Sequence, residues 1–195
     1  KQIEKAVVWM IKPKTQDKEP FRLKYISAGP LATPELAAEQ AFDEIIHFAQ
    51  ISRNGLGYAK QAISADAKHF DDLREKLVKY EEISDRIEYE IAAFLNGVSA
   101  GDISEATSMK IKAMYKIIGE LESLGDSGEA ISRMLSRRNE HKKTFSAETI
   151  DNINLMLEKV DNAYEVMIAN LNAAHEGTLT SITNAYNAEE QINVL

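Results

Sequence analysis

The residues between 70 and 96 constrain the fold most strongly. Their apolar side chains recur at steps of 4, 3, 3, 4, 4 and 3 residues, at Leu73, Leu77, Tyr80, Ile83, Ile87, Ile91 and Phe94. This period places all seven on one side of an α-helix and leaves the other side polar. We expect Asn96-Gly97 to end the helix, because both residues favour the left-handed conformation that follows a helix. Such a helix must bury its apolar side against other elements, and a helical bundle provides them.

The same period predicts four further helices, over residues 35–65, 104–137, 146–174 and 178–195. The chain is 44% hydrophobic, with only 9 Gly and 4 Pro to interrupt helices. Pro34 suits a first helical turn, where its missing N–H is not needed. In the first helix we expect an apolar side made by Leu36, Ala37, Ala41, Ile45, Phe48 and Ala49. In the third we expect Met109, Ile111, Met114, Ile117, Ile118, Leu121 and Leu124 to face inward. The predicted fold class is therefore all-α, an up-down bundle.

Charge is distributed unevenly along the chain. Residues 1–24 hold seven Lys or Arg against three Asp or Glu, a net charge of +4, so the total of −8 leaves −12 for the remainder. An acidic body disfavours a nucleic-acid partner, because phosphate contacts need clustered cations. A basic leading segment is typical of chain that follows a membrane span on its cytoplasmic side, although charge alone favours a solvated linker. Trp9 suits either a membrane interface or packing on the bundle, and no run of 18 uncharged apolar residues exists to span a membrane.

A shift of 108 residues aligns the first predicted helix with the fourth. It pairs Asp43 with Asp151, Ile45 with Ile153, Asn54 with Asn162, and Ala65 with Ala173. A constant offset of this kind indicates duplicated helical units. We therefore expect two tandem three-helix repeats, 34–143 and 144–195, with the last helix of the second repeat missing. The chain starts at Lys1 and ends inside a predicted helix, so we expect a fragment of a longer protein.

Two Glu-x-x-x-Asp pairs are the candidate metal ligands. Glu81 and Asp85 lie one helical turn apart, and so do Glu122 and Asp126 on the next predicted helix. Two antiparallel neighbours could bring all four carboxylates together, and oxygen-only ligation suits Mg²⁺, Mn²⁺ or iron. The alternative is that these carboxylates are solvated surface.

Signatures of catalysis are missing from the sequence. The histidines, His47, His69, His141 and His175, show no ligand spacing, and the Glu-x-x-His pattern of di-iron bundles is missing. The basic run Arg133, Arg137, Arg138, His141, Lys142 and Lys143 complements the dipole of a helix C-terminus. Cysteine is absent, which excludes thiolate sites. The sequence contains no phosphate-binding loop and no nucleophile elbow, so we expect a non-enzyme.

Several segments resemble the PhoU family. Glu120-Leu-Glu-Ser-Leu-Gly-Asp126 and Glu81-Glu-Ile-Ser-Asp85-Arg-Ile87 are similar to the acidic segments of PhoU repeats. Phe21-Arg-Leu-Lys-Tyr-Ile-Ser27 and Thr33-Pro-Glu-Leu-Ala-Ala-Glu-Gln-Ala41 resemble the lead-in to the PhoU-like domain of sodium/phosphate cotransporters. The sequence departs from the family at Ser123, where an Arg is usual, and at Asn193, where the second repeat loses a carboxylate.

The resemblance implies a juxtamembrane linker at 1–33 and a PhoU-like bundle at 34–195. It implies a regulatory domain of a sodium-dependent phosphate transporter, at the cytoplasmic face of the bacterial inner membrane. The partner would be the transmembrane part of the same chain, and a homo-oligomer is a second possibility. The four carboxylates would hold Fe, Mn, Zn or Mg. The alternatives are a free-standing PhoU-type adaptor in phosphate signalling and a di-metal helical-bundle enzyme.

Overall fold

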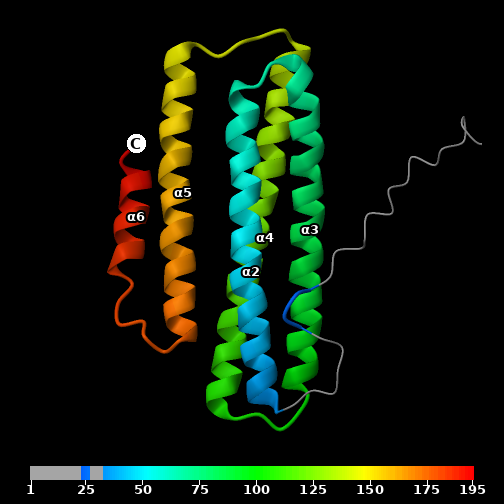
Figure 1. Ribbon diagram of the computed structural model, residues 1–195, viewed down its shortest axis with the longest axis vertical. Coiled ribbons are helices and arrows are strands. Elements are labelled where there is room, and N and C mark those ends of the chain that lie inside the picture. The colour runs from blue at the N-terminus through cyan, green and yellow to red at the C-terminus, as the bar shows by residue number, and fades with distance from the viewer. Residues whose placement is uncertain (1–22, 27–32) are drawn as a thin grey trace, which may run out of the picture.

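Helices make up most of the described part of the chain. The computed structural model describes residues 23–26 and 33–195, and in this part of the chain every regular element is helical. The helices are α2 (Pro34–Ser64), α3 (Ala67–Ser99), α4 (Glu105–Glu140), α5 (Ala147–His175) and α6 (Thr183–Asn193) (Figure 1). The predicted all-α class is confirmed. The expectations for residues 1–22 and 27–32, including Trp9 and most of the 1–33 linker, lie outside the described residues.

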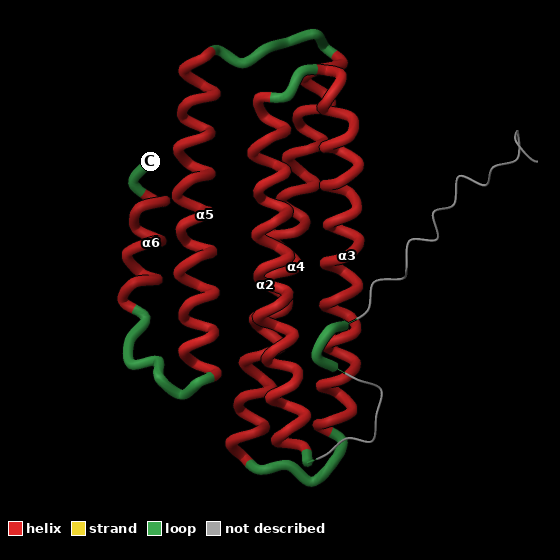
Figure 2. Tube along the Cα trace, in the orientation of Figure 1, coloured by secondary structure: helices red, strands yellow, loops and turns green. Residues whose placement is uncertain are grey.

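The helices alternate in direction along the chain, and loops at the two ends of the bundle connect them (Figure 2). α2, α3 and α4 all pack on one another, so they form a three-helix bundle. α5 joins this bundle along α2, and α6 packs on α5 (Figure 1). This arrangement is the predicted up-down bundle. The tandem repeat of 34–143 and 144–195 stays a prediction.

The core lies along the inside of α2, α3 and α4, in two clusters, the second of which also includes Leu157 of α5. The first includes Ile45, Phe48, Ile87, Ile91 and Met114, all of them fully buried. The second, nearer the α2–α3 turn, is built around Ala59, Leu77, Leu135 and Leu157. Burial of a side chain the size of leucine stabilises the fold by about 1.5–3 kcal/mol. The apolar stripe of residues 70–96 therefore faces the core, as its period predicts.

Side-chain caps fix where three helices begin. Thr33, Ser104 and Ser146 each accept a hydrogen bond from a backbone N–H three residues ahead, at the starts of α2, α4 and α5. Each cap satisfies one of the N–H groups that a helix start leaves without a partner. The predicted starts of the first, third and fourth helices agree with these caps to within a residue or two.

Two helix ends differ from the prediction. α3 continues through Asn96-Gly97 to Ser99, because Gly97 keeps helical geometry there. α6 begins at Thr183 rather than near residue 178. Gly177, with a φ of 69°, follows the end of α5, and residues 178–182 are not helical. Thr178 and Gly177 then donate backbone hydrogen bonds to Ala173 and Ala174, a paired arrangement that terminates a helix.

Three residues expected to face inward lie toward solvent instead. Met109 is 65% exposed, Leu36 49% and Leu124 39%. The side of α4 that packs on α2 and α3 is centred on Met114 and Leu121, and 100° per residue carries Met109 almost to the opposite side. Helical spacing alone does not decide which flank of a wide apolar stripe is covered.

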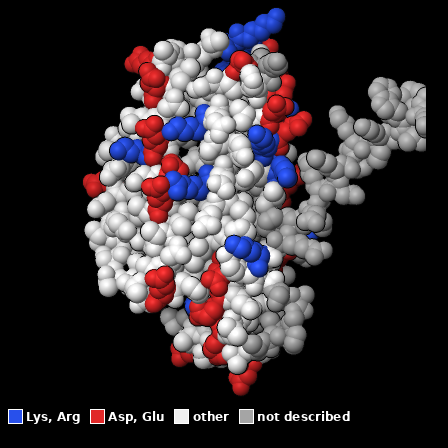
Figure 3. Space-filling view, in the orientation of Figure 1, with Lys and Arg blue, Asp and Glu red and all other residues white. Residues whose placement is uncertain are grey.

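Acidic and basic side chains are interspersed on the face of the molecule drawn in Figure 3. The basic run at the end of α4 has structural roles there. Arg138 donates a hydrogen bond to the Ile63 carbonyl and lies 4.9 Å from the centre of the Phe145 ring. His141 caps the helix C-terminus. No ligand is needed to explain these residues.

A candidate metal centre between α3 and α4

A close contact between two helices positions the candidate centre. Ser84 of α3, only 1% exposed, packs directly on Gly125 of α4. A Cβ atom on Gly125 would lie 2.7 Å from Ser84 Oγ and 2.9 Å from Ser84 Cβ. Real Cβ atoms do not approach that closely, so the helix approach requires glycine at position 125. Acidic residues on both sides of this contact are thereby brought to one edge of the α3–α4 interface.

Three of the four predicted carboxylates come together at this edge. Glu81, Asp85 and Asp126 each offer one oxygen, and these oxygens all lie within 4.8 Å of one another. Glu81 is half-buried, whereas the two aspartates are exposed. The i, i+4 spacing thus places two ligands on α3 and the antiparallel neighbour supplies the third. We call these three residues the acidic triad.

Glu122, the fourth predicted ligand, stands outside the triad. Its carboxylate accepts a hydrogen bond of 3.4 Å from the Ser123 hydroxyl. It lies near enough to Asp126 and Asp85 to feel their charges, but it does not share the compact oxygen group. Glu122 is therefore a neighbour of the candidate centre.

The electrostatics of this edge favour a cation. Burial, and then the charges of Asp85 and Asp126, raise the pKa of Glu81 above its usual range. Burial, and then Asp126 and Asp85, likewise raise the pKa of Glu122. Among the described residues, no Lys or Arg forms an ion pair with these carboxylates. A raised pKa means that the ionised carboxylate is disfavoured there, so a bound cation would relieve the repulsion.

The donor set indicates which ions the triad could hold. Three carboxylates leave several positions of an octahedral ion to water, as Mg²⁺ and Mn²⁺ commonly allow. Iron also accepts such ligands, whereas zinc usually takes His or Cys. No histidine belongs to the triad. The oxygen-only set therefore fits a hard cation better than zinc.

The histidines serve other contacts. His47 pairs with the buried Glu44 at 2.8 Å. His175 at the end of α5 lies 3.1 Å from an Asp43 oxygen, and its ring stacks on Phe42 with 5.4 Å between centres. The latter contacts hold the end of α5 on the start of α2, so they stabilise the bundle.

Two features of the structure were not predicted from the sequence. The Ser84–Gly125 contact that organises the triad was not predicted, although a glycine inside a helical pattern signals close packing. An apolar pocket between α2, α3, α4 and α5 was not predicted either. Both features depend on how each helix is rotated about its axis, and residue spacing along the chain does not give that rotation.

Comparison with family models, with curated proteins and with solved structures found no match to this chain. Among the described residues, no helix combines the length and the apolar character that a membrane crossing requires.

Proposed function

We propose that this chain is a regulatory domain of a sodium-dependent phosphate transporter, at the cytoplasmic face of a bacterial inner membrane. It responds to a hard divalent cation held at the acidic triad. The observation that carries the proposal is the approach of the Glu81, Asp85 and Asp126 oxygens to within 4.8 Å across two helices. The transporter assignment is supported by the resemblance of residues 21–27 and 33–41 to cotransporter lead-in segments. The role is binding and regulation rather than catalysis.

A cation at the triad would act by joining α3 to α4. The ion shifts a conformational equilibrium only if it binds one arrangement of these helices more tightly than the other. Residues 23–26, the described part of the lead-in, could transmit such a shift from the bundle toward the membrane part. The Tyr25 N–H donates a hydrogen bond of 2.6 Å to the buried Glu44 on α2, and Leu23 and Ile26 pack against the core. A change in the bundle would therefore reach the residues that precede α2.

The first test is metal binding. Purified protein is stripped with a chelator, reloaded separately with Mn²⁺, Mg²⁺ or Fe²⁺, and analysed for bound metal and for melting temperature. We expect near-stoichiometric Mn²⁺ or iron and a higher melting temperature in the wild type. The variant Glu81→Gln/Asp126→Asn should lose both effects. Without metal, this variant should be at least as stable as the wild type, because like charges have been removed.

A matched control is Glu82→Gln/Glu120→Gln, which removes two exposed charges from the same two helices. It should bind metal as the wild type does. Equal metal content in both double variants, or none in the wild type, would contradict the metal site.

The second test is transport. Sodium-dependent uptake of radiolabelled phosphate is measured in cells whose own copy of the protein carries either double variant. We expect the triad variant to change the uptake rate at least several-fold at low metal supply, and the control to leave it unchanged. Metal binding without any effect on uptake would refute the transporter role but leave the metal site standing. Altered phosphate signalling with normal uptake would favour the free-standing adaptor instead.

A further inference from the structure

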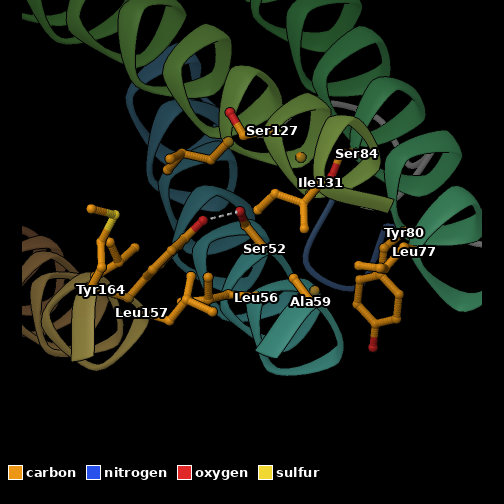
Figure 4. Close-up of a pocket in the computed structure, with 16 residues that line it drawn as sticks. Ser52, Leu56, Ala59, Leu77, Tyr80, Ser84, Ser127, Ile131, Leu157 and Tyr164 are labelled. Carbon is orange, nitrogen blue, oxygen red and sulfur yellow. Dashed lines mark hydrogen bonds between the residues drawn. The ribbon is translucent and has the colours of Figure 1, made fainter. Parts of the chain in front are cut away.

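A pocket of about 280 Å³ lies between α2, α3, α4 and α5 (Figure 4). α5 packs on the bundle along α2, which leaves space between α4 and α5 beside that contact. Leu124 and Met156, 39% and 47% exposed, lie at the pocket from α4 and α5. None of the triad carboxylates lines the pocket, and Gly128 and Ile131 lie about half a turn of α4 away from Asp126, although Ser84 and Gly125 border both sites. The pocket is therefore a site of its own, and it goes beyond the function proposed above.

The lining is apolar and uncharged. It consists of aliphatic and aromatic side chains, three glycines and a few hydroxyls. Among the lining residues there is no Asp, Glu, Lys, Arg or His. A charged ligand group would have to lose its water with no opposite charge to replace it, so the pocket selects against ions.

The hydroxyls of the lining differ in their hydrogen bonds. Ser52 and Tyr164 are paired across α2 and α5 at 2.7 Å, as the dashed line in Figure 4 shows. Ser84 is 1% exposed, yet its hydroxyl makes no hydrogen bond within the described residues. Because Ser84 lines the pocket, a ligand with one polar atom can hydrogen-bond to this hydroxyl.

Glycines keep the pocket open. A Cβ on Gly128 would have its nearest neighbour, Leu77 Cδ2, at 3.8 Å, which is ordinary contact distance. A side chain at position 128 is therefore sterically allowed, and its absence leaves room. The volume exceeds that of engineered cavities of about 150 Å³ that bind benzene, and it lies near the lower end of small-ligand sites, about 300–1,000 Å³.

We infer that this pocket binds a small, uncharged and mainly apolar molecule that carries a single hydroxyl or carbonyl group, which hydrogen-bonds to Ser84. The space is too small for a helix and has no charge to recognise an ion. The apolar walls provide affinity, and the Ser84 hydroxyl fixes orientation.

The test uses simple probes on the purified chain. Phenol and toluene represent the proposed class, and benzoate and benzylamine are charged molecules of similar size. Binding is measured by calorimetry and by ligand-observed NMR. We expect phenol to bind with a Kd on the order of 1 mM or tighter, in line with the usual affinity per atom of very small ligands. The charged probes should bind at least tenfold more weakly.

Two variants locate the site. Gly128→Leu fills the pocket and should weaken phenol and toluene at least tenfold. Gly97→Leu is its control, because nothing lies within 4 Å of a Cβ there and the residue does not line the pocket. Ser84→Ala should weaken phenol several-fold and leave toluene unchanged, and it removes only one atom, so folding is preserved.

The inference is overturned if neither uncharged probe binds the wild type, or if Gly128→Leu and the wild type bind them equally. It is also overturned if benzoate or benzylamine binds as tightly as phenol. None of these outcomes bears on metal at the triad, so the two proposals fail separately.

Discussion

At the residue scale, the contact between Ser84 and Gly125 is the most sensitive point of the structure. Gly125→Ala places a methyl group 2.7 Å from Ser84 Oγ, so one helix must move. Such overpacking typically destabilises by about 1–3 kcal/mol, which outweighs the gain of about 1 kcal/mol in helix propensity. We expect Gly125→Ala to lower the free energy of unfolding in urea and to weaken metal binding at the triad.

Gly119→Ala is the matched control on the same helix. Nothing lies within 4 Å of a Cβ at Gly119, so only the propensity gain remains. This variant should raise stability by about 0.5–1 kcal/mol. If the two variants changed stability by the same amount, the close approach of α3 and α4 at Gly125 would be wrong.

The buried pair of Ser52 and Tyr164 is a second residue-scale test. Tyr164→Phe removes the hydrogen-bond partner of Ser52, a residue that is 6% exposed. Leaving a buried hydroxyl without a hydrogen bond costs about 1–3 kcal/mol. Tyr89→Phe, at a position 71% exposed, should stay within about 0.5 kcal/mol of the wild type. Chemical denaturation of both variants measures the difference, and equal stability would contradict the burial of the pair.

At the element scale, an ion pair joins α2 to α5. Arg53 donates hydrogen bonds of 2.7 and 3.0 Å to the two Asp161 oxygens, and this lowers the pKa of Asp161. A lowered folded-state pKa means that the pair's contribution is present above the unfolded value near 3.8 and is lost as pH falls through the folded value. Both groups are partly exposed, so the contribution is about 1 kcal/mol or less.

The variant Asp161→Asn should therefore be less stable than the wild type at pH 6, and the difference should shrink as the pH falls below 3.8 and through the lowered pKa of Asp161. Melting curves between pH 2.5 and 7 measure this. Glu158→Gln, in the longer and more exposed pair with Lys60, serves as the control and should change little. A difference that persisted unchanged at the lowest pH would show that the effect is not ionic.

The helices themselves were predictable because their periodicity is long and regular. The stripe from Leu73 to Ile91 and the caps at Ser104 and Ser146 are local signals, and local signals fix where helices lie. The end of α3 was not predictable, since Gly97 stays helical whereas Gly177, the same residue type, adopts a left-handed conformation after α5. Only the surrounding packing decides between those conformations.

The candidate site was predictable in part, for a similar reason. The spacing of Glu81 and Asp85 guarantees that they share a helix side, and the turn between α3 and α4 brings Asp126 near them. Glu122 has the same spacing to Asp126, yet it lies outside the triad, because the rotation of α4 is set by Gly125 and the core. The pocket is formed by four helices together, so the sequence of any one segment does not predict it.

At the scale of the whole molecule, the five described helices differ in how many neighbouring helices they pack against. α2, α3 and α4 pack on one another, whereas α5 reaches them along α2 and α6 packs on α5. Of the residues of α6, only Ala188 is buried. Units with few buried apolar contacts open at lower free energy than the core. The molecule should therefore unfold in two steps, with the α5–α6 pair first.

Native-state hydrogen exchange measures this order directly. Amides of α6 should exchange at the lowest opening free energy, those of α5 next, and those at the centre of α2–α4 only through global unfolding. Arg53→Ala removes the pairs with Asp161 and Glu165 and should lower the opening free energy of α5 and α6 by up to about 1 kcal/mol. The protection of α3 and α4 should not change. A single opening free energy shared by all five helices would mean that α5 and α6 are integral to one cooperative core, and the pocket between α4 and α5 would then be a rigid part of it.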